Sequence, residues 1–573
     1  MCQYINDFIR SRTYGAPCII IPIPKTTGSV IPLWNLRQIS LTCVTAKMFE
    51  NIIKARLNQI SERDNWLPEY QNGFRKGRST SDCTIIVQQA IHTAFRKKEI
   101  LLAVFLDIQK AYDNVNRTLL FEIIKEKPGI PIKVLNWLKK FLLSDRRGRV
   151  KFKNVLSKEY IFKNGVPQGS PISPLLFNIY ASGLKEVRKE NVSQFADDLV
   201  IWETASDYEL ARSKIQKSIN EINEWVHSIG LRFAPKKCKP VAFTRKHIWE
   251  TQPIVLDGEE IKVENSAKYL GITFDKTMCW KQHIEVIVGR AKQRSYYLRM
   301  LANSKNGVLQ STMVLLYQSI VRPIIGYGSC VWGEISDTNK RKLDSVQHQA
   351  LTKALGVMRI AKRTRTNYEA STWSLDLRRK QQLIRTWRRV GNTQTMGILL
   401  SLSHQEILNG KRQSFIERVR NLAVRLKIPL EVLKNLKNDE IDFIIKKIQI
   451  KEASKEEVIF FSLKCPKRSQ SDFGTSRKIN SIWHQARLRV IPLNDLMERI
   501  KISKKRECTN CKVPETIEHF VKECPIYENI WEHNNVSQER VKPLENILSN
   551  FPKWKKRKIA QVLFESAKRR RIS

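Results

Sequence analysis

The chain has 573 residues, and 101 Lys and Arg against 55 Asp and Glu give a formal net charge of +46 at pH 7. So large a charge favours a nucleic acid as partner, because a polyanion would relieve the self-repulsion of a compact fold; a merely soluble basic protein or one that binds acidic membrane surfaces is the alternative. No run of about 18 apolar residues occurs, and the start carries charges where a signal peptide needs an apolar core, so we expect an intracellular protein that is neither secreted nor membrane-spanning.

The length predicts roughly three to five domains of about 100–200 residues each. In residues 15–275, short apolar runs alternate with amphipathic stretches such as AKMFENIIKARLNQI (46–60). The runs expected to form strands are CIIIPIP (18–24), LLAVFLDI (101–108), LVIWET (199–204) and YLGITF (269–274). This alternation predicts an α+β fold in which helices pack on a largely antiparallel sheet.

Strand signals become rare after residue 275. Residues 276–390 read as successive helices with basic outer faces, and 391–480 keep helical periodicity without recognisable chemistry. We treat 481–545 as a basic segment with a Cys/His cluster and 546–573 as a basic tail, which we expect to be solvated.

Carboxylates occur at two places where a buried strand normally excludes charge. Asp107 ends the apolar run LLAVFLD, and Asp197 and Asp198 precede LVIW. Burying such groups costs several kcal/mol unless they are paired or bound to metal, and all-oxygen ligands favour hard cations such as Mg²⁺. Two Mg²⁺ ions about 3.5–4 Å apart would support nucleotidyl transfer by in-line displacement. The alternative for the doublet is a pair of solvated turn residues.

The segment NGVPQGSPISPLLFNIY (164–180) combines glycines and prolines with an apolar helix that follows directly. Such a loop brings backbone groups close to a ligand at the start of a helix. An ordinary tight connection is the alternative, and composition does not exclude it.

The order of these motifs resembles that of reverse transcriptases, specifically those of jockey-like non-LTR retrotransposons. The motifs are IPIPK (21–25), LRQISL (36–41), QNGFRKGRST (71–80), FLDIQKAYD (105–113), GVPQGSPISP (165–174), FADD (195–198), GLRFAPKKC (230–238) and KYLGITFD (268–275). The resemblance implies a right-hand polymerase, with fingers and palm in 15–275 and a helical thumb and connection in 276–390.

The resemblance also implies a role for each matching residue. Asp107, Asp197 and Asp198 would bind the two Mg²⁺ ions, and Lys237 would assist the departure of pyrophosphate, with Lys236 as the alternative register. The positions expected to bind the nucleotide are Lys25, Arg37, Tyr112, Gln168 and Gly169, where Tyr112 would exclude a ribose 2′-hydroxyl and the two cations would hold the triphosphate. Arg75 and Arg78 are further candidate cations, although basic loop residues are usually solvated.

The cluster Cys508-x2-Cys511-x7-His519-x4-Cys524 offers three thiolates and an imidazole, which suit tetrahedral zinc. Three free thiols and a surface histidine are the alternative; the other eight of the 11 cysteines are scattered singly. The cluster resembles the zinc-knuckle-like element near the C-terminus of many non-LTR polyproteins. Trp483, in the preceding basic stretch, would stack on a base or pack in a helical core.

The resemblance implies an RNA-directed DNA polymerase that takes an RNA template, a DNA primer or target and deoxynucleoside triphosphates, and acts in the nucleus or in a cytoplasmic ribonucleoprotein. The alternative is a catalytically silent remnant that only binds nucleic acid; a group II intron maturase is disfavoured by the motif wording and the Cys/His cluster. We expect neither an apurinic-type endonuclease nor a ribonuclease H activity, because we find no segment for either. A Met1 so close to the fingers would then indicate a truncated copy or a truncated gene model.

Overall fold

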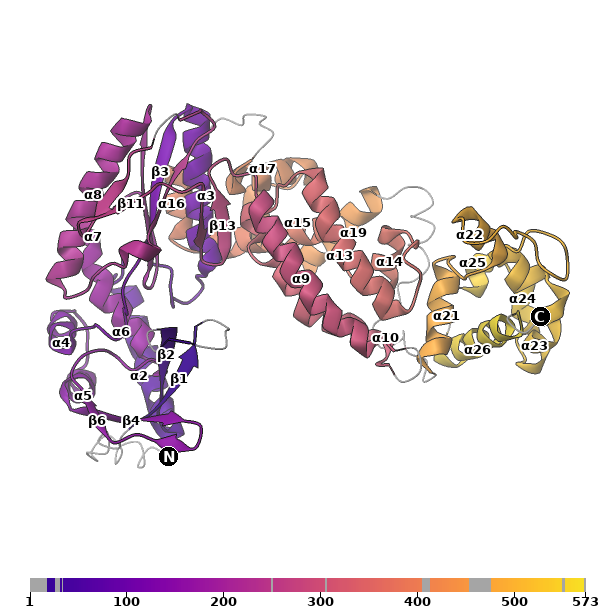
Figure 1. Ribbon diagram of the computed structural model, residues 1–573, viewed down its shortest axis with the longest axis horizontal. Helices are drawn as coiled ribbons and strands as arrows, with labels where there is room; N and C mark the ends of the chain where they lie inside the picture. Colours follow the sequence, from indigo (N-terminus) through magenta and orange to yellow (C-terminus); the bar gives the residue numbers. More distant parts are fainter. Residues whose placement is uncertain are drawn as a thin grey trace. The chain divides into compact units, whose positions relative to one another are not determined.

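The computed structural model describes residues 18–25, 31–32, 35–248, 251–303, 307–403, 413–452, 476–548 and 552–570 (Figure 1). Two compact units are present, and each combines two stretches of sequence. The first contains Met1–Met278 and Trp387–Asn421, and the second contains Cys279–Thr386 and Leu422–Ser573. Among the described helices, none has both the length and the apolar composition needed to span a bilayer.

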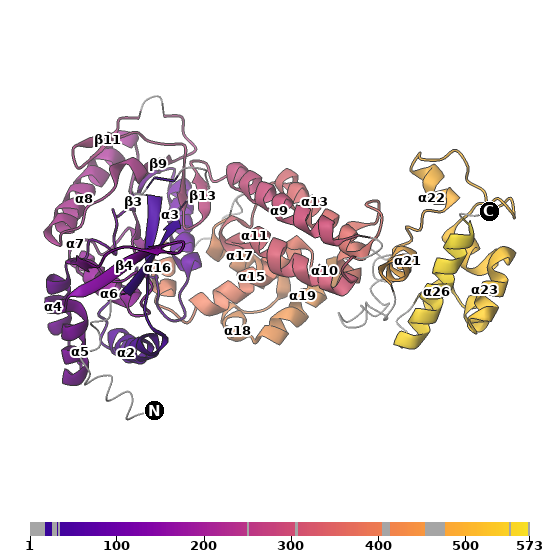
Figure 2. The ribbon, with the colours of Figure 1, turned by 60° about the horizontal axis from the view of Figure 1, so that its bottom comes forward.

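A four-stranded sheet in the order β7-β8-β3-β9 lies at the centre of the first unit. The strands are β3 (Ile100–Asp107), β7 (Val192–Phe195), β8 (Asp198–Ala205) and β9 (Lys239–Phe243), and all their pairings are antiparallel. Helices α8 (Tyr208–Ser228) and α3 (Thr80–Lys97) lie on opposite sides of this sheet (Figures 1 and 2). Their cover explains why β3 is an unbroken apolar run that ends at a charged residue.

A second sheet in the first unit contains β1 (Cys18–Pro24), β2 (Leu36–Leu41), β4 (Arg146–Phe152), β5 (Val155–Leu156) and β6 (Tyr160–Phe162). The pairing of β1 with β4 is parallel, so the largely antiparallel sheet that we predicted is in fact an antiparallel sheet and a mixed one. Two hairpins follow, β10 (Ile254–Leu256) with β11 (Glu259–Ile261) and β12 (Ser266–Tyr269) with β13 (Ile272–Asp275). The other helices are α2 (Val44–Arg63), α4 (Arg117–Lys125), α5 (Ile132–Leu143), α6 (Ser173–Tyr180), η3 (Ala181–Gly183), α7 (Leu184–Val187) and η4 (Pro235–Lys237).

Residues 387–421 return to the first unit after a long excursion. They include the last turn of α15 (Leu375–Val390), α16 (Thr395–Ser401) and the first half of α17 (Phe415–Leu426). Helix α16 packs on α3. The boundary that we drew between 390 and 391 therefore does not coincide with a boundary between compact units, because periodicity alone does not say which core a helix joins.

The described part of the second unit is helical, as the loss of strand signals predicts. Its first stretch contains α9 (Lys281–Leu301), α10 (Gln310–Leu316), η5 (Tyr317–Val321), α11 (Arg322–Gly326), α12 (Ser329–Trp332), α13 (Asp337–Leu355) and α14 (Arg363–Glu369). Helices α18 (Leu430–Asn435) and α19 (Asn438–Glu452) follow in the second stretch.

The C-terminal residues of the second unit form α21 (Arg477–Arg487), α22 (Asn494–Arg499), η7 (His519–Glu523), η8 (Pro525–Tyr527), α23 (Glu528–His533), α24 (Ser537–Arg540), α25 (Leu544–Ile547) and α26 (Lys553–Arg570). Trp483 is buried in their shared core and does not present its ring for stacking. Ile559 and Leu563 of α26 lie in the same core, so the described part of the tail that we expected to be solvated is a packed helix.

A buried ion cluster joins α14 to α21. The Glu369 carboxylate is fully buried and accepts hydrogen bonds from Arg487 Nε at 2.9 Å and 3.0 Å. Nδ1 of His484 lies 2.8 Å from the same carboxylate. Burial opposes the charged form of Glu369, but Arg487 and His484 outweigh it and hold the pKa at about 2. The cluster fastens the C-terminal helices to the earlier part of their own unit.

Candidate active site and candidate metal centre

The predicted aspartates meet at one end of the central sheet of the first unit. Asp107, the last residue of β3, is the register partner of Asp198, the first residue of β8. Residues directly opposite each other in an antiparallel pair have Cβ atoms about 4.5–5.5 Å apart. Asp197 lies in the two-residue turn between β7 and β8, because Phe195 pairs with Asp198. The sheet therefore brings the three carboxylates together.

Two carboxylates of this group, Asp197 and Asp198, have raised pKa values. Burial raises the pKa of Asp197, and the charge of Asp107 adds to the shift. Asp198 keeps exposed surface, yet the protein atoms packed around its carboxylate, with the charges of Asp197 and Asp107, raise its pKa to about 6. Crowded carboxylates with raised pKa values have the properties of a cation site.

The turn that carries Asp197 is held by the motif QNGF (71–74), whose role the sequence did not reveal. Gln71 Oε1 accepts hydrogen bonds from the backbone N–H groups of Ala196 at 3.0 Å and Gly73 at 2.8 Å. The Asn72 N–H donates to the Gln194 carbonyl at 2.9 Å. A Cβ on Gly73 would lie 2.6 Å from the Ala196 nitrogen, so this position requires glycine.

Arg75 and Arg78, which the sequence offered as further candidate cations, make hydrogen bonds within this scaffold. Arg75 is buried and donates to the Glu62 carboxylate at 2.7 Å and 2.6 Å, and also to the Pro68 and Gln71 carbonyls. Arg78 donates to the Glu69 carbonyl at 2.5 Å and to Asn72 Oδ1 at 3.2 Å. Neither arginine is among the residues that line the cavity described next.

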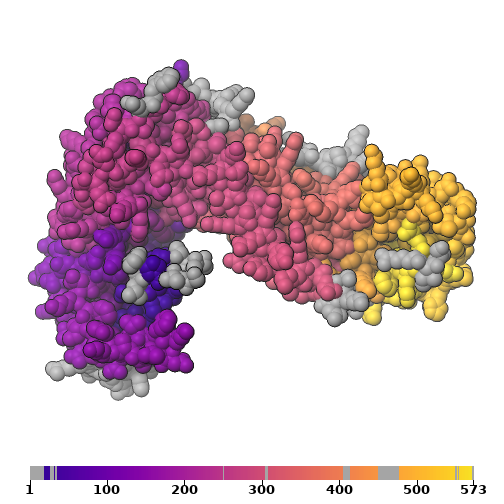
Figure 3. Space-filling view, viewed as in Figure 1, coloured from indigo at the N-terminus to yellow at the C-terminus, as the bar shows by residue number. Residues whose placement is uncertain are grey.

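A cavity of about 460 Å³ opens beside the aspartates. The surface of the first unit is indented next to the indigo residues of β1 and β2 (Figure 3). Of the predicted catalytic and nucleotide-binding residues, those that line this cavity are Lys25, Arg37, Asp107, Tyr112, Gln168, Gly169, Asp197 and Lys237. Asp198 is not among the lining residues; Lys110 and Asp113, which we did not single out, are. Nζ of Lys237 lies 3.2 Å from Asp107 Oδ1, which favours Lys237 over the alternative, Lys236.

The loop before α6, residues 164–172, lies against β2 on one wall of the cavity. Gly169 has φ +125°, and a Cβ there would lie 2.4 Å from the Ser40 carbonyl oxygen. The Ser40 N–H donates to the Gln168 carbonyl at 2.6 Å, and Gln168 Nε2 donates to Asp113 at 3.3 Å. The loop is therefore more than a connection, since its glycine permits a close approach that fixes Gln168 at the cavity.

The Tyr112 side chain belongs both to the packed interior and to the wall of the cavity. Its ring stacks on Phe177 with centroids 5.2 Å apart and an interplanar angle of 20°, and it also lines the cavity. Burial raises the pKa of the Tyr112 phenol, and the charge of Asp197 adds to this, so the hydroxyl stays protonated at neutral pH.

Comparison with known proteins decides the family of this region. Residues 23–274 match the family described as reverse transcriptase (RNA-dependent DNA polymerase). This segment is a reverse transcriptase domain.

The relatives of the reverse transcriptase domain confirm its jockey-like, non-LTR character. The chain is 32% identical to "Probable RNA-directed DNA polymerase from transposon BS" of Drosophila melanogaster, over 55% of this chain and 36% of the relative. It is 28% identical to "RNA-directed DNA polymerase from mobile element jockey" of the same species, over 59% of this chain and 37% of the relative. The match thus covers little more than a third of each relative's length.

Solved structures similar to the chain include apo telomerase from Candida tropicalis. The likeness has a TM-score of 0.35 and 12% identity, over 80% of this chain and 70% of that one.

The predicted zinc ligands meet in the second unit, C-terminal to the reverse transcriptase domain. The ligand atoms of Cys508, Cys511, His519 and Cys524 all lie within 4.8 Å of one another. Sγ of Cys524 is 3.9 Å from Sγ of Cys508 and 3.7 Å from Sγ of Cys511. These separations exclude disulfide bonds, which need about 2.05 Å. A turn closed by the Lys512 N–H to the Cys508 carbonyl, at 3.0 Å, brings the first two cysteines together.

The imidazole of His519 has one buried nitrogen that is available for a ligand. Nε2 makes no hydrogen bond within the described part of the chain, whereas Nδ1 lies 3.6 Å from the Glu523 carboxylate. Burial, with the nearby thiols of Cys511 and Cys508, raises the pKa of the Cys524 thiol to about 12. Three crowded sulfurs and a buried, unpaired nitrogen fit a bound cation better than free thiols and a surface histidine.

Proposed function

We propose that this chain is an RNA-directed DNA polymerase of a non-LTR retrotransposon, which copies an RNA template by extending a primer 3′-hydroxyl. The observation that carries the proposal is the convergence of Asp107 and Asp197 with Lys25, Arg37 and Lys237 on one cavity of a reverse transcriptase domain. The names of the relatives, RNA-directed DNA polymerases of transposons, support the same activity.

Asp107, Asp197 and Asp198 would hold two Mg²⁺ ions. The donor set fits, because hard divalent cations prefer carboxylate oxygens and these carboxylates repel one another without a cation. Bound Mg²⁺ would supply Lewis acidity for in-line transfer, activating the primer hydroxyl and stabilising the leaving pyrophosphate. The strand ends fix the carboxylates in advance, so that no reorganisation of the protein is needed during the reaction.

The other cavity residues would bind and orient the nucleotide. Arg37 would contact triphosphate oxygens with two parallel hydrogen bonds, and Lys25 would contribute a point charge. The ring of Tyr112, held by Phe177, would occupy the space of a ribose 2′-hydroxyl. Gln168 and Gly169 would lie beside the templating base and the incoming nucleotide. Lys237 would assist the departure of pyrophosphate, by donating a proton to it or by placing a positive charge beside it.

The Cys/His cluster would bind one structural zinc ion and form a zinc knuckle. A tetrahedral site with Zn–S bonds of about 2.3 Å places its sulfurs about 3.8 Å apart, and the Cys524 sulfur lies 3.9 Å and 3.7 Å from the other two. The knuckle and the basic helices around it would bind the template or the target DNA electrostatically. Such a protein would act in the nucleus, where its target lies, and in the cytoplasm as a ribonucleoprotein.

A catalytically silent remnant that only binds nucleic acid is not favoured. Binding alone does not require aspartates and basic side chains gathered at one cavity. Primer extension on an RNA template separates the two. The full chain should extend a DNA primer with Mg²⁺ and not without it, and Asp107→Asn should lose this activity. The control variant Asp439→Asn, which changes an exposed aspartate of α19, should keep it. Template binding without extension in the wild type would favour the remnant.

A further inference from the structure

Helix α3 carries buried polar side chains on the face turned away from the central sheet. Asp82 is 0% and Gln88 1% exposed. The sheet covers the opposite face through β7 and β3. Burying unsatisfied polar groups would be costly, so these side chains need partners from another part of the chain.

The described residues of 387–421, which are 387–403 and 413–421, supply those partners along the length of α3. The Phe415 N–H donates to Gln88 Oε1 at 3.0 Å, and the Thr93 hydroxyl donates to the Leu402 carbonyl at 2.6 Å. Arg96, near the C-terminal end of α3, forms an ion pair with Glu417. The returning segment thus covers the outer face of a helix whose inner face supports the sheet with the aspartates.

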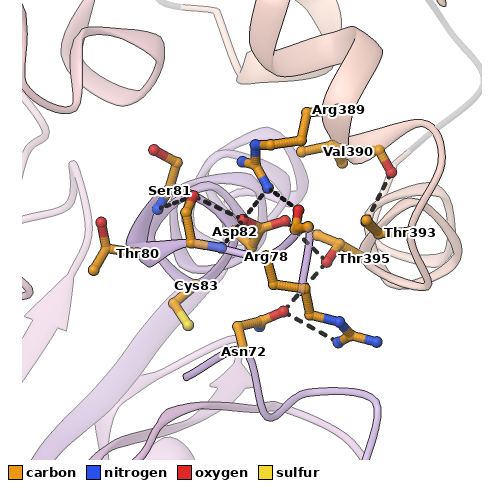
Figure 4. A network of polar contacts seen from close by, with 12 residues as sticks. Asn72, Arg78, Thr80, Ser81, Asp82, Cys83, Arg389, Val390, Thr393 and Thr395 are labelled. Atoms are coloured by element: carbon orange, nitrogen blue, oxygen red, sulfur yellow. Dashed lines mark hydrogen bonds and ion pairs between the residues drawn. The ribbon is translucent and has the colours of Figure 1, made fainter. Parts of the chain in front are cut away.

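The strongest of these contacts surround Asp82 at the start of α3 (Figure 4). Its Oδ2 accepts from Arg389 at 2.5 Å and from the Ser79 N–H at 2.8 Å, and the Thr395 hydroxyl lies 3.2 Å from its Oδ1. Arg389 also donates to the Gly77 carbonyl at 3.0 Å. A fully buried carboxylate paired with a guanidinium is held in one geometry, because separating the pair would leave a charge unpaired.

The contacts continue from Asp82 to the catalytic turn through Asn72. The Thr395 hydroxyl lies 3.4 Å from Asn72 Oδ1 and shares its single hydrogen between this atom and Asp82. The Asn72 backbone N–H in turn donates to the carbonyl of Gln194, two residues before Ala196. The returning segment therefore reaches the turn that carries Asp197 through one intermediate residue.

We infer that Asp82, Arg389 and Thr395 are positioning residues for the polymerase, acting through Asn72 on the turn that carries Asp197. The inference rests on the proposed function. It makes residues 387–421 part of the catalytic unit, although the family match ends far upstream of them, at residue 274. Lys25 and Arg37, the proposed ligands of the triphosphate, lie at β1 and β2 in the other sheet of this unit. Loss of the contacts around Asp82 should therefore affect the chemical step more than nucleotide binding.

The test compares Thr395→Val with Thr393→Val in the full chain. Thr395 is fully buried in the network, whereas the Thr393 hydroxyl donates to the Val390 carbonyl at 2.9 Å within its own turn (Figure 4). Thr395→Val should lower kcat for primer extension about fivefold with little change in KM for the nucleotide. It should also speed hydrogen exchange of the Asn72 and Ala196 amides about tenfold. Thr393→Val should leave both measurements unchanged.

Arg389→Lys and Arg389→Ala provide a graded second pair. Lysine keeps the charge beside Asp82 and should restore part of the kcat that alanine loses. Equal behaviour of the two threonine variants, or unchanged exchange at Asn72 and Ala196 in Thr395→Val, would overturn the inference. If the wild type extends no primer, the proposed function fails, while the exchange measurement still decides whether these residues position the turn.

Discussion

The two regions that gather candidate metal ligands hold them by different means. In the first unit, Asp107 and Asp198 are fixed by strand pairing. The turn with Asp197 is fixed by the hydrogen bond that Gln71 Oε1 accepts from the Ala196 N–H and by the one that the Asn72 N–H donates to the Gln194 carbonyl. In the second unit, the ligands Cys508 to Cys524 lie on a turn, a short π-helix and a loop, with the isolated bridge between Glu507 and Pro514 as the nearest described β pairing. The fold itself holds the first site, and we propose that the second is held largely by the zinc ion that it would bind.

This difference separates stability from activity. Carboxylates that strand pairing holds against their mutual repulsion cost folding free energy and serve the reaction. In our proposal the Cys/His cluster draws much of its order from a bound zinc ion, so that binding free energy becomes folding free energy. Substitutions in the two regions should therefore have opposite signatures.

The largest expected effect is the loss of zinc from the C-terminal cluster. Removing the ion should lower the free energy of local unfolding by about 10 kcal/mol, because no sheet in the described part of this region holds the four residues together. Cys511→Ser should lower bound zinc from one ion per chain to well below one and unfold residues around 508–524, as measured by metal analysis and hydrogen exchange. Cys279→Ser, which changes a cysteine outside the cluster, should change neither. Extension on a short template should persist, with weaker nucleic-acid binding at physiological salt.

A wild-type chain without stoichiometric zinc would contradict the proposed zinc site. The four residues would then be three thiols and a histidine gathered by packing around Phe520 and Tyr527.

Asp197→Asn should show the opposite signature. Primer extension should fall by about 10³-fold or more, because a ligand of the transferring metals is lost. The midpoint of thermal unfolding should stay equal or rise, since the substitution removes a charge that Asp107 and Asp198 repel. Extension at more than a tenth of the wild-type rate would contradict the site, and a large fall in unfolding midpoint would show that the carboxylate stabilises the fold.

Glu369→Gln tests whether the buried cluster of Glu369, Arg487 and His484 stabilises the second unit without the help of a metal ion. The substitution leaves Arg487 buried beside a neutral group, which should cost about 3–5 kcal/mol of unfolding free energy at pH 7. The folded pKa of about 2 lies below the ordinary 4.5, so the charged form stabilises the fold above pH 4.5. This contribution is lost as the pH falls from 4.5 through 2.

Urea unfolding of wild type and variant at several pH values checks this expectation. The difference between them should be largest at neutral pH and shrink toward pH 3. Glu518→Gln, at an exposed pair with Arg489, should cost less than about 1 kcal/mol at every pH. Equal losses for both variants would show that the buried cluster is no more than a surface pair in effect.

The grouping of Asp107 and Asp197 beside one cavity could be predicted from the sequence, because charge at the end of an apolar strand is visible in the chain itself. The role of Gln71 could not, since a glutamine in a loop gives no sign that it caps a turn more than a hundred residues later. The return of 387–421 was equally hidden: the buried Asp82 of α3 reads as an ordinary helix cap until its partner Arg389 is known.

Tyr112→Ala is the smallest expected effect and tests how far packing alone shapes the first site. The ring is half-buried against Phe177 and also lines the cavity, so its removal opens space beside the sugar without removing a metal ligand. Ribonucleotide incorporation relative to deoxyribonucleotide should rise about tenfold, since one steric contact is worth roughly 1–3 kcal/mol. Tyr112→Phe should keep the wild-type preference, because the ring and not the hydroxyl fills the space. Competition between the two nucleotides in single-turnover extension measures this ratio directly. An unchanged ratio in Tyr112→Ala, with extension preserved, would leave Tyr112 as a core residue that supports Phe177 and would assign sugar selection to another wall of the cavity.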